Sequence, residues 1–352
     1  MKIAIVYDRV NKWGGAERVL LALHEIFPKA PLYTSVYSPD SAGWAKVFPE
    51  IKTSFLQRIP FAKNHHEFLA PLMPLAFNTF NFDEYDLVIT VTSEFAKNIN
   101  VRNGKHVCYC LTPTRYLWSH EKQYFNFWFL FFTKPMTKYL KRIDKMAAKK
   151  PDIMIAISTS VQKRIKKYYK RESKIIFPPI DIPHSSFKKL NNYYLIVSRL
   201  VSYKRINLAI EAFNELNLPL IIVGTGHEEK KLKKLAKKNI QFAGFVHNND
   251  LENYYKNAKA FIFPQEEDFG ITAVEAQSYG IPVIAYKAGG SLDTVIQNKT
   301  GVFFGKQNQK SLIEAIRKFE KIKFSRSAIV KNSNKFSKEK FKKEFLKLMQ
   351  EL

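Results

Sequence analysis

Cysteine is nearly absent from this chain of 352 residues, which contains only Cys108 and Cys110. The two lie at positions i and i+2 of an expected strand, where side chains point to the same face. Two thiols without neighbouring histidine or further cysteine do not make a metal site. We therefore expect two buried free thiols, as in a cytosolic protein.

Long apolar runs are also lacking. The longest aromatic run, 124–132, is shorter than the roughly 20 apolar residues that a membrane-spanning helix needs. The chain starts directly with a strand pattern at 2–7, and no cleavable signal segment is evident. These features predict a protein that is soluble or peripheral to a membrane rather than integral.

Acidic residues are scarce, since 31 Asp and Glu stand against 57 Lys and Arg and the formal net charge is +26. Such an excess attracts polyanions, whether nucleic acid, acidic lipid headgroups or phosphorylated substrates. A Lys-rich and Asn-rich coding bias explains part of it. The hydrophobic content of 46% excludes disorder, and the length suits two domains.

Residues 261–290 form the pattern around which the chain is organised. The apolar run 261–263 predicts a buried strand, 265–268 a polar loop, 269–280 a helix and 282–286 a second strand. This order is typical of a βαβ unit in a parallel sheet, where ligands bind at the carboxyl ends of the strands.

Two carboxylates frame the expected helix, Glu267 in the preceding loop and Glu275 inside it. An anion would meet the backbone N–H groups of Phe269, Gly270 and Ile271 and the positive end of the helix dipole. Carboxylates beside an anion site suit the hydroxyls of a sugar or ribose attached to a diphosphate. Alternatively, Glu267 helps to cap the helix and Glu275 is a solvated helix residue.

The first half of the chain predicts another parallel sheet. Its expected strands are 3–7, 32–37, 87–92, 106–111 and 153–158, the last of these closing the first domain, with a Pro-punctuated helical region at 61–80. Gly14 and Gly15 open a helix after the first strand. Glycines at such a turn let the backbone approach a phosphate or sugar closely, although a tight turn is the simpler interpretation.

Residues 124–150 are crowded with aromatic side chains in their first part and with basic side chains in their second. Apolar anchors beside a basic stretch suit a surface helix that rests on anionic lipid. A core helix followed by a solvated basic face is the alternative.

The second half continues with a strand at 194–198 that runs into Arg199 and Lys204. The fragment Gly224-Thr225-Gly226 lacks the third glycine of a dinucleotide fingerprint, so it is interpreted as a turn and disfavours an NAD enzyme. The basic segment 230–238 is most simply a solvated face.

These motifs, in this order, resemble those of a known family. Glu267 and Glu275 form an E-x7-E pair, followed by G-x-P-V-I-A at 280–285 and by the pair Gly289-Gly290. The pattern resembles the donor site of retaining glycosyltransferases of family 4, and the resemblance covers essentially the whole chain. The segment 266–271 is similar to the branch that includes GDP-mannose-dependent mannosyltransferases of O-antigen and other polysaccharide assembly.

The resemblance implies an α/β structure of the GT-B type, with two Rossmann-like doubly wound parallel-sheet domains facing each other across a cleft. The divisions it implies are an acceptor-side domain at 1–178, a Pro-rich linker at 179–189, a nucleotide-sugar donor domain at 190–333 and a helix at 334–352 that crosses back to the first domain.

The resemblance also implies roles for particular residues. Glu267 would orient the sugar hydroxyls, while Arg199 and Lys204 would grip the donor diphosphate, and these three are the expected catalytic residues. The other implied contacts are Glu275, which would hold the ribose, and the donor-binding residues Phe269, Gly270, Ile271, Val246, Gly14 and Gly15. Arg115, in the segment 112–118, is available to bind an acceptor phosphate, although a structural ion pair is an equally good interpretation.

One position departs from the family pattern. The family normally carries a histidine directly before Thr112-Pro113, near the donor sugar and its diphosphate, and this chain has Leu111 there. Either a neighbour such as His106 or His120 substitutes, or rate is lost.

The sequence thus predicts a retaining hexosyltransferase, cytoplasmic and peripheral on the inner face of the plasma membrane. GDP-mannose is the favoured donor and a UDP-hexose the second, and the acceptor is a glycan or a polyprenyl-diphosphate-linked oligosaccharide. No Asp-x-Asp or histidine-cluster motif appears where the donor should sit, so neither a metal nor a further cofactor is expected.

A second hypothesis is a polyanion-binding protein, either nucleic-acid-binding or a catalytically silent relative. The charge and Leu111 motivate it. Because the basic residues are dispersed rather than built into a recognition motif, no specific nucleic-acid partner is expected.

Overall fold

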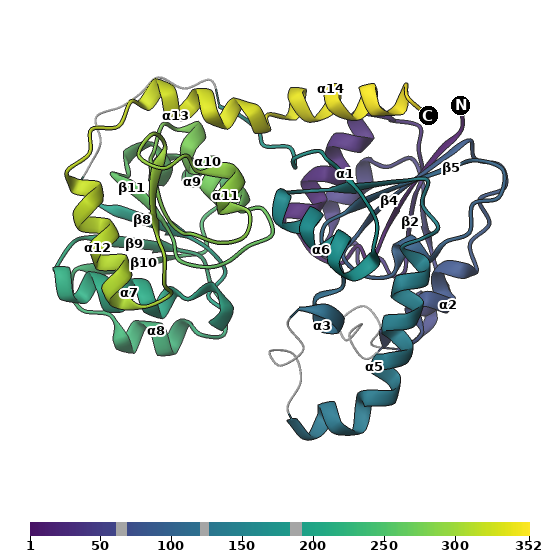
Figure 1. Ribbon diagram of the computed structural model, residues 1–352, viewed down its shortest axis with the longest axis horizontal. Coiled ribbons are helices and arrows are strands. Elements are labelled where there is room, and N and C mark those ends of the chain that lie inside the picture. The colour runs from purple at the N-terminus through teal and green to yellow at the C-terminus, as the bar shows by residue number, and fades with distance from the viewer. Residues whose placement is uncertain (61–68, 120–126, 184–191) are drawn as a thin grey trace. The chain divides into compact units, whose positions relative to one another are not determined.

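The computed structural model describes residues 1–60, 69–119, 127–183 and 192–352. The chain divides into two compact units, one formed by Met1–Pro178 with Phe341–Leu352 and the other by Pro179–Lys340. Each unit contains its own parallel sheet with helices around it (Figure 1).

The first unit is built on seven parallel strands in the order β3-β2-β1-β4-β5-β6-β7. Their bounds are β1 Ile3–Tyr7, β2 Leu32–Thr34, β3 Ile51–Thr53, β4 Leu87–Thr92, β5 Lys105–Cys110, β6 Ile153–Ala156 and β7 Lys174–Ile175. Its α-helices are α1 Gly15–Ile26, α2 Met73–Asn78, α3 Arg115–Trp118, α5 Phe127–Ala147 and α6 Thr159–Tyr169, and its 3-10 turns are η1 Gly43–Val47, η2 Phe55–Arg58 and η4 Ala96–Asn98.

The second unit has six parallel strands in the order β10-β9-β8-β11-β12-β13. They are β8 Tyr194–Val197, β9 Leu220–Val223, β10 Ile240–Gly244, β11 Ala260–Phe263, β12 Val283–Tyr286 and β13 Gly301–Phe304. The helices are α7 Ile206–Leu216, α8 Glu229–Leu235, α9 Asn248–Asn257, α10 Ile271–Ser278, α11 Ser291–Thr294, α12 Gln309–Glu320 and α13 Arg326–Ser333, with the turns η5 Ser202–Lys204 and η6 Asn334–Phe336.

The strands of the second unit bury both faces, which explains their short, continuous apolar runs. Because side chains alternate along a strand, Ile196 and Ile262 join one core with α7 and α12, while Leu195 and Phe261 join the other with α9 and α10. Helices therefore lie on both sides of the sheet (Figure 1). The prediction of two doubly wound parallel-sheet α/β domains is confirmed.

The last helix, α14 Lys338–Met349, returns the chain end to the first unit. The Phe345 ring lies 6.4 Å from the Phe27 ring at the end of α1, and the Phe341 ring lies 5.9 Å from the Tyr109 ring on β5. Just beyond the end of the helix, Glu351 forms an ion pair of 2.5 Å with Lys174. Apolar side chains three and four positions apart thus give α14 a buried face.

Several predicted elements differ from the structure. The segment 153–158 is not the last strand of its sheet, because β7 pairs with β6 beyond it. The strand expected at 32–37 ends at Thr34, and β3, which pairs with it, was not expected. Strands of two or three residues carry too few side chains to show a period. In the expected helical region 61–80 the structure has α2, and residues 61–68 lie outside the described residues.

Each sheet has one place where the chain order reverses. In the first sheet it lies between β1 and β4, and in the second between β8 and β11. Loops that leave two neighbouring parallel strands in opposite directions open a crevice at their carboxyl ends, which is where ligands bind in such sheets. The functional side chains should therefore follow these four strands.

Candidate active site

The reversal point of the second sheet brings together two of the predicted catalytic residues. Lys204 lies in η5 after β8, and Glu267 lies in the loop after β11, 63 positions along the chain. The Lys204 ammonium forms an ion pair with the Glu267 carboxylate, and the two side chains are only 14% and 16% exposed. A largely buried ion pair at this place is the candidate reaction centre, because both side chains come from strand ends at the switch point.

Arg199, the third predicted catalytic residue, lies on the same loop as Lys204. Its guanidinium donates a 2.9 Å hydrogen bond to the Tyr203 hydroxyl, and the Lys204 ammonium lies 5.3 Å from the centre of the Tyr203 ring. Tyr203 thus touches both cations and holds them on one short segment. Sequence reasoning missed Tyr203, although its place between two basic residues was a usable signal.

The loop that carries Glu267 is held by the Gly289-Gly290 pair. The Gly290 N–H donates a 2.8 Å hydrogen bond to the Glu267 carbonyl. A Cβ atom at Gly290 would lie 2.3 Å from the Phe269 Cα, and one at Gly289, whose φ is +63°, would lie 2.2 Å from the Glu267 carbonyl oxygen. Only glycine permits this approach, so the pair fixes the backbone from which Glu267 extends.

Helix α10 begins immediately after this loop. Gly270 precedes it with a left-handed φ of 92°, and Ile271 is its first residue. The first N–H groups of a helix have no partner within the helix, so they are available to an anion. The Phe269 side chain is buried and its ring lies 5.4 Å from the Phe336 ring, so only its backbone could serve a ligand.

Glu275 lies one turn into α10, and its carboxylate accepts a 3.1 Å hydrogen bond from the Tyr255 hydroxyl on α9. The Tyr255 ring stacks on the Tyr279 ring, with centroids 5.4 Å apart and planes 7° from parallel. Glu275 is therefore positioned by a tyrosine pair that sequence reasoning missed. It is half-buried rather than a freely solvated helix residue.

Val246 follows β10 on the same edge of the sheet. Its side chain packs against the core that contains α9 and α10, whereas the neighbouring Phe245 is exposed. Gly224 and Gly226, after β9, support the Arg199 loop, since a Cβ at Gly226 would lie 2.2 Å from the Leu200 carbonyl oxygen. Interpreting this fragment as a turn agrees with its place in the structure.

In the first unit, Gly14 and Gly15 lie where α1 begins, just after β1. Glu17 is buried beneath them and accepts a 3.0 Å hydrogen bond from the Tyr7 hydroxyl. Burial raises the pKa of Glu17. A Cβ at Gly14 would lie 3.1 Å from a Glu17 carboxylate oxygen, so this glycine makes room for that carboxylate.

Asp8 organises the reversal point of the first sheet and was also missed. Its carboxylate accepts hydrogen bonds from the Ser93, Glu94 and Ala96 N–H groups at 2.7, 3.1 and 2.9 Å, and from the Thr92 hydroxyl at 2.8 Å. An aspartate directly after a buried first strand could have indicated such a role. These bonds tie the end of β1 to the loop after β4.

The segment 112–118 is anchored by another buried carboxylate, Asp144 on α5. Asp144 accepts hydrogen bonds from the Thr114 hydroxyl at 3.1 Å, the Trp118 indole at 2.6 Å and the Tyr169 hydroxyl at 2.8 Å, and it pairs with Lys97 at 2.6 Å. This network has a structural role. The predicted acceptor residue, Arg115, starts α3 within the anchored segment and is half-buried.

Leu111 lies directly after β5, and its N–H donates to the Thr92 carbonyl at 2.8 Å. His106 lies at the other end of the same strand, because it is the second residue of β5 whereas Leu111 follows the last. Its side chain is buried, and its ring contacts the Thr90 hydroxyl at 3.1 Å. Burial lowers the pKa of His106 to about 3, so it stays neutral inside the core. The suggestion that His106 substitutes for the family histidine is therefore wrong, and His120 lies outside the described residues.

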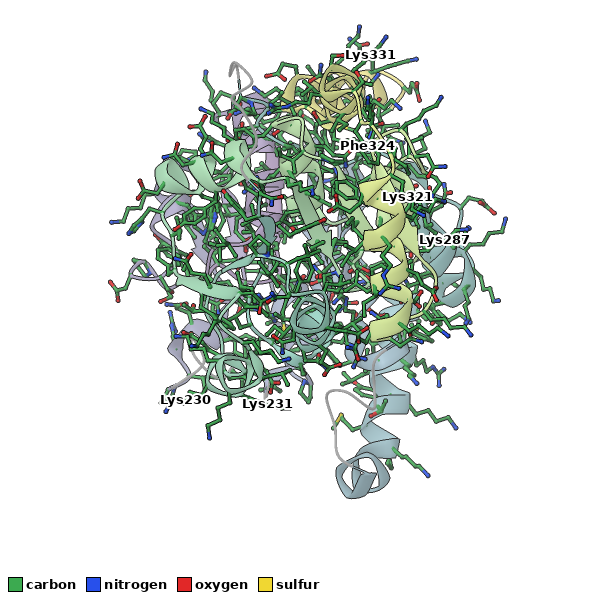
Figure 2. All side chains as sticks on the ribbon, turned by 90° about the vertical axis from the view of Figure 1, so that its left-hand side faces the viewer. Lys230, Lys231, Lys287, Lys321, Phe324 and Lys331 are labelled. Carbon is green, nitrogen blue, oxygen red and sulfur yellow. The ribbon has the colours of Figure 1, made fainter. Side chains whose placement is uncertain are left out.

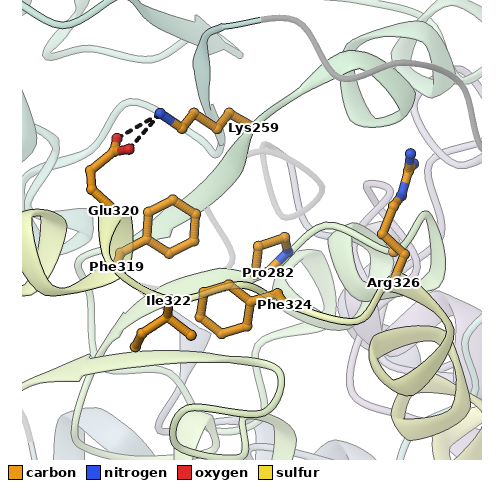
Figure 3. Close-up of a pocket in the computed structure, with 8 residues that line it drawn as sticks. Lys259, Pro282, Phe319, Glu320, Ile322, Phe324 and Arg326 are labelled. Atoms are coloured by element: carbon orange, nitrogen blue, oxygen red, sulfur yellow. Dashed lines mark hydrogen bonds and ion pairs between the residues drawn. The ribbon is translucent and has the colours of Figure 1, made fainter.

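A hollow of about 190 Å³ lies on the opposite edge of the second sheet (Figure 3). Lys259, just before β11, and Pro282, just before β12, line it. The Lys259 ammonium donates to both oxygens of Glu320 at 2.7 Å. Because this hollow faces the amino ends of the strands, it is separate from the Lys204–Glu267 pair.

Within the part of the chain that the structure describes, no three His, Cys, Asp or Glu side chains gather into a metal-binding group.

Comparison with known proteins agrees with this fold. Two doubly wound parallel-sheet domains define the GT-B architecture of glycosyltransferases, and the crystal structure of Anabaena HepE in complex with UDP and glucose matches with a TM-score of 0.74 and 18% identity, over 100% of both chains. Residues 178–336 match the sequence family described as "Glycosyl transferases group 1". The match covers less than half of the chain.

Two curated relatives align mainly with part of the chain. The capsular polysaccharide biosynthesis glycosyltransferase CapM of Staphylococcus aureus is 29% identical over 171 residues, 45% of this chain and 45% of its own. The O-antigen chain mannosyltransferase C of Escherichia coli is 24% identical over 198 residues, 51% of this chain and 52% of its own. The chain thus spans about half the length of these relatives.

Proposed function

We propose that this protein is a retaining glycosyltransferase that moves a hexose from a nucleoside-diphosphate sugar to a glycan or lipid-linked acceptor. The observation that carries the proposal is the Lys204–Glu267 pair, with Arg199 beside it, at the carboxyl ends of β8 and β11. Cations at this place suit a diphosphate, and a carboxylate suits the hydroxyls of the attached sugar. The family match of residues 178–336 supports the same interpretation.

In the proposed reaction, Arg199, Lys204 and the N–H groups at the start of α10 stabilise the negative charge that grows on the leaving diphosphate. The bond between the sugar C1 and the phosphate oxygen breaks, and the acceptor oxygen bonds to C1 from the same face. The departing phosphate oxygen takes the acceptor proton. This route retains the anomeric configuration and needs neither a protein base nor a metal.

Mannose carried by GDP is the donor we favour, because the segment 266–271 resembles the mannosyltransferase branch and a relative is named as an O-antigen mannosyltransferase. A UDP-hexose is the alternative, supported by the fold neighbour whose structure holds UDP and glucose. The names of both curated relatives favour polysaccharide assembly as the process.

A thermal-shift panel with GDP, UDP, GDP-mannose, UDP-glucose and UDP-N-acetylglucosamine tests the donor class. A ligand at about 100 times its dissociation constant should stabilise the protein by about 2.7 kcal/mol, which is visible in the melting temperature. We expect selective stabilisation by GDP and GDP-mannose. Selective stabilisation by the UDP compounds would overturn the donor, and no shift with any of the five would favour the catalytically silent, polyanion-binding alternative.

We also propose that α5 rests on an anionic membrane surface, where a lipid-linked acceptor would be found. Three apolar side chains of α5 are exposed along one flank, at 44% for Met136, 57% for Tyr139 and 59% for Met146. Lys138 and Arg142 belong to the exposed basic side beside it. Apolar anchors beside cations suit the headgroup region of anionic lipid. Among the described helices, none combines the length and the apolar character that crossing a bilayer requires.

Replacing Lys138 and Arg142 together by glutamine should weaken binding to phosphatidylglycerol-containing vesicles about 30-fold, since each basic residue near such a surface contributes about 1 kcal/mol. Vesicle co-sedimentation measures it. The matched control replaces Lys230 and Lys231, which point outward from the second unit (Figure 2), and should leave binding nearly unchanged. Equal losses in both variants would show that net charge alone, and not α5, binds the vesicles.

A further inference from the structure

The two groups proposed to act on the donor are bound to each other in the structure. The Lys204 ammonium and the Glu267 carboxylate form an ion pair, and both side chains are about six-sevenths buried. Each group is therefore engaged by the other. A donor that needs both of them meets a site in which both are already occupied.

The backbones on the two sides of this pair are fixed. The Glu267 carbonyl accepts from the Gly290 N–H at 2.8 Å, and the Lys204 N–H donates to the Val201 carbonyl at 3.0 Å. The Gly289 and Gly290 backbones also pack so closely against the Glu267 loop that a Cβ atom on either would clash with it. Any rearrangement must therefore take place in the two side chains, of which lysine has the longer and more flexible one.

We infer that the Lys204–Glu267 ion pair is a latch that the donor diphosphate opens. Lys204 exchanges the carboxylate for phosphate oxygens, and the released Glu267 carboxylate turns to the sugar hydroxyls. The inference rests on the proposed function, because it assigns the diphosphate to Lys204. It goes further in stating that the donor forms its contacts to Lys204 and to Glu267 together. Both contacts compete with the ion pair that already joins these two side chains.

The latch predicts a difference between the whole donor and the product nucleotide. A nucleotide sugar offers new contacts to both Lys204 and Glu267, whereas a nucleoside diphosphate offers one only to Lys204 and gives Glu267 no new contact in exchange for the ion pair. When a ligand binds only the open form, its apparent affinity equals its affinity for that form multiplied by the fraction of protein that is open. The latch should thus weaken product binding more than donor binding, which favours product release.

The test is the affinity of GDP and UDP, measured by calorimetry, for the wild-type protein and for Glu267→Gln. Glutamine keeps the shape of the side chain but cannot hold the lysine as an ion pair. For the nucleoside diphosphate that the wild type binds, we expect about fivefold tighter binding by Glu267→Gln, on the scale of a lost ion pair of roughly 1 kcal/mol. For the corresponding nucleotide sugar we expect a smaller gain, because the variant also loses the sugar contact.

Glu267→Gln also removes the direct electrostatic repulsion between the carboxylate and the diphosphate. We therefore measure the same substitution in a second background, which makes a double-mutant cycle. With Lys204→Met present, a latch can no longer form, and adding Glu267→Gln should change nucleoside diphosphate affinity less than twofold. Simple repulsion would give the same gain in both backgrounds. Such a cycle isolates the coupling between the two side chains.

The matched control is Glu320→Gln, which alters the Lys259–Glu320 pair on the opposite edge of the same sheet (Figure 3) and should leave affinity unchanged. Equal gains with and without Lys204, or no gain in Glu267→Gln, would overturn the latch while leaving the proposed function in place. Binding of neither GDP nor UDP by the wild type would overturn the proposed function, and the latch with it.

Discussion

Lys204→Ala is expected to slow sugar transfer by about 100-fold or more, the largest effect on activity that we predict for a single residue. The variant loses one charge-stabilising contact to the leaving diphosphate, and such contacts are worth about 3–4 kcal/mol of barrier in a site shielded from water. The position supports this magnitude, because the Lys204 side chain is only 14% exposed and its pair with Glu267 lies at the switch point of the second sheet.

The measurement is release of nucleoside diphosphate from the donor that the wild type selects, with lipid-linked oligosaccharide as acceptor. Lys259→Ala is the matched control, because Lys259 also pairs with a glutamate in the second unit but lies before β11 rather than after it. The control should retain its rate within about twofold, since it removes only a partly exposed ion pair. Turnover by Lys204→Ala close to that of the wild type would remove Lys204 from the active site.

Asp144→Asn is expected to destabilise the first unit by about 3–5 kcal/mol, the range for breaking a buried ion pair by removing one partner. Asp144 and Lys97 have side chains only 0% and 1% exposed. Burial opposes the charge on Lys97, but the Asp144 carboxylate, together with Cys110 and Cys108, outweighs burial, so that the pKa of Lys97 lies above its ordinary value. The asparagine leaves this ammonium buried without its counter-charge.

Urea unfolding followed by tryptophan fluorescence checks this prediction, because all four tryptophans lie in the first unit. The variant's deficit should shrink as the pH rises toward about 10.4, the ordinary lysine pKa. Without Asp144, burial lowers the folded-state pKa of Lys97, so the unfolded state then binds more protons and stability increases with pH. A deficit that does not depend on pH would instead assign the loss to the hydrogen bonds of Asp144.

The control for this experiment is Glu172→Gln. Glu172 pairs with Lys166 at 2.6 Å, but the two side chains are largely exposed. Exposed pairs contribute about 0–1 kcal/mol, so this variant should unfold almost as the wild type does. An equal loss in both variants would show that the effect of Asp144→Asn is not specific to the buried network.

The sequence was a good guide to the two sheets. Strands buried on both faces read as continuous apolar runs, as in Ile3–Tyr7 and Leu87–Thr92, and each such run is visible without any knowledge of its neighbours. The short edge strands β3 and β7 were not predicted, because two or three residues show no period. Their pairing depends on the strand beside them.

The candidate site was predictable in position but not in its internal contacts. Lys204 and Glu267 each follow an apolar run, so both could be assigned to strand ends. Lys204 and Glu267 can bind each other only because β8 and β11 are neighbours in the sheet. No local sequence pattern predicts that pairing. The roles of Tyr255 and Asp8 were missed for the same reason, since each acts on a group brought close by folding, whereas Tyr203 contacts Arg199 and Lys204 within its own segment.

By itself, the sequence determined the elements of this protein and the strand ends that carry its charged side chains, because both depend on residues adjacent in the chain. The tertiary structure decided which of those side chains meet. Asp144 collects Lys97, Thr114 and Tyr169 from segments 25 to 47 positions away, and Gly290 holds the loop of Glu267. Burial makes these contacts energetically important, and burial is a property of the folded chain.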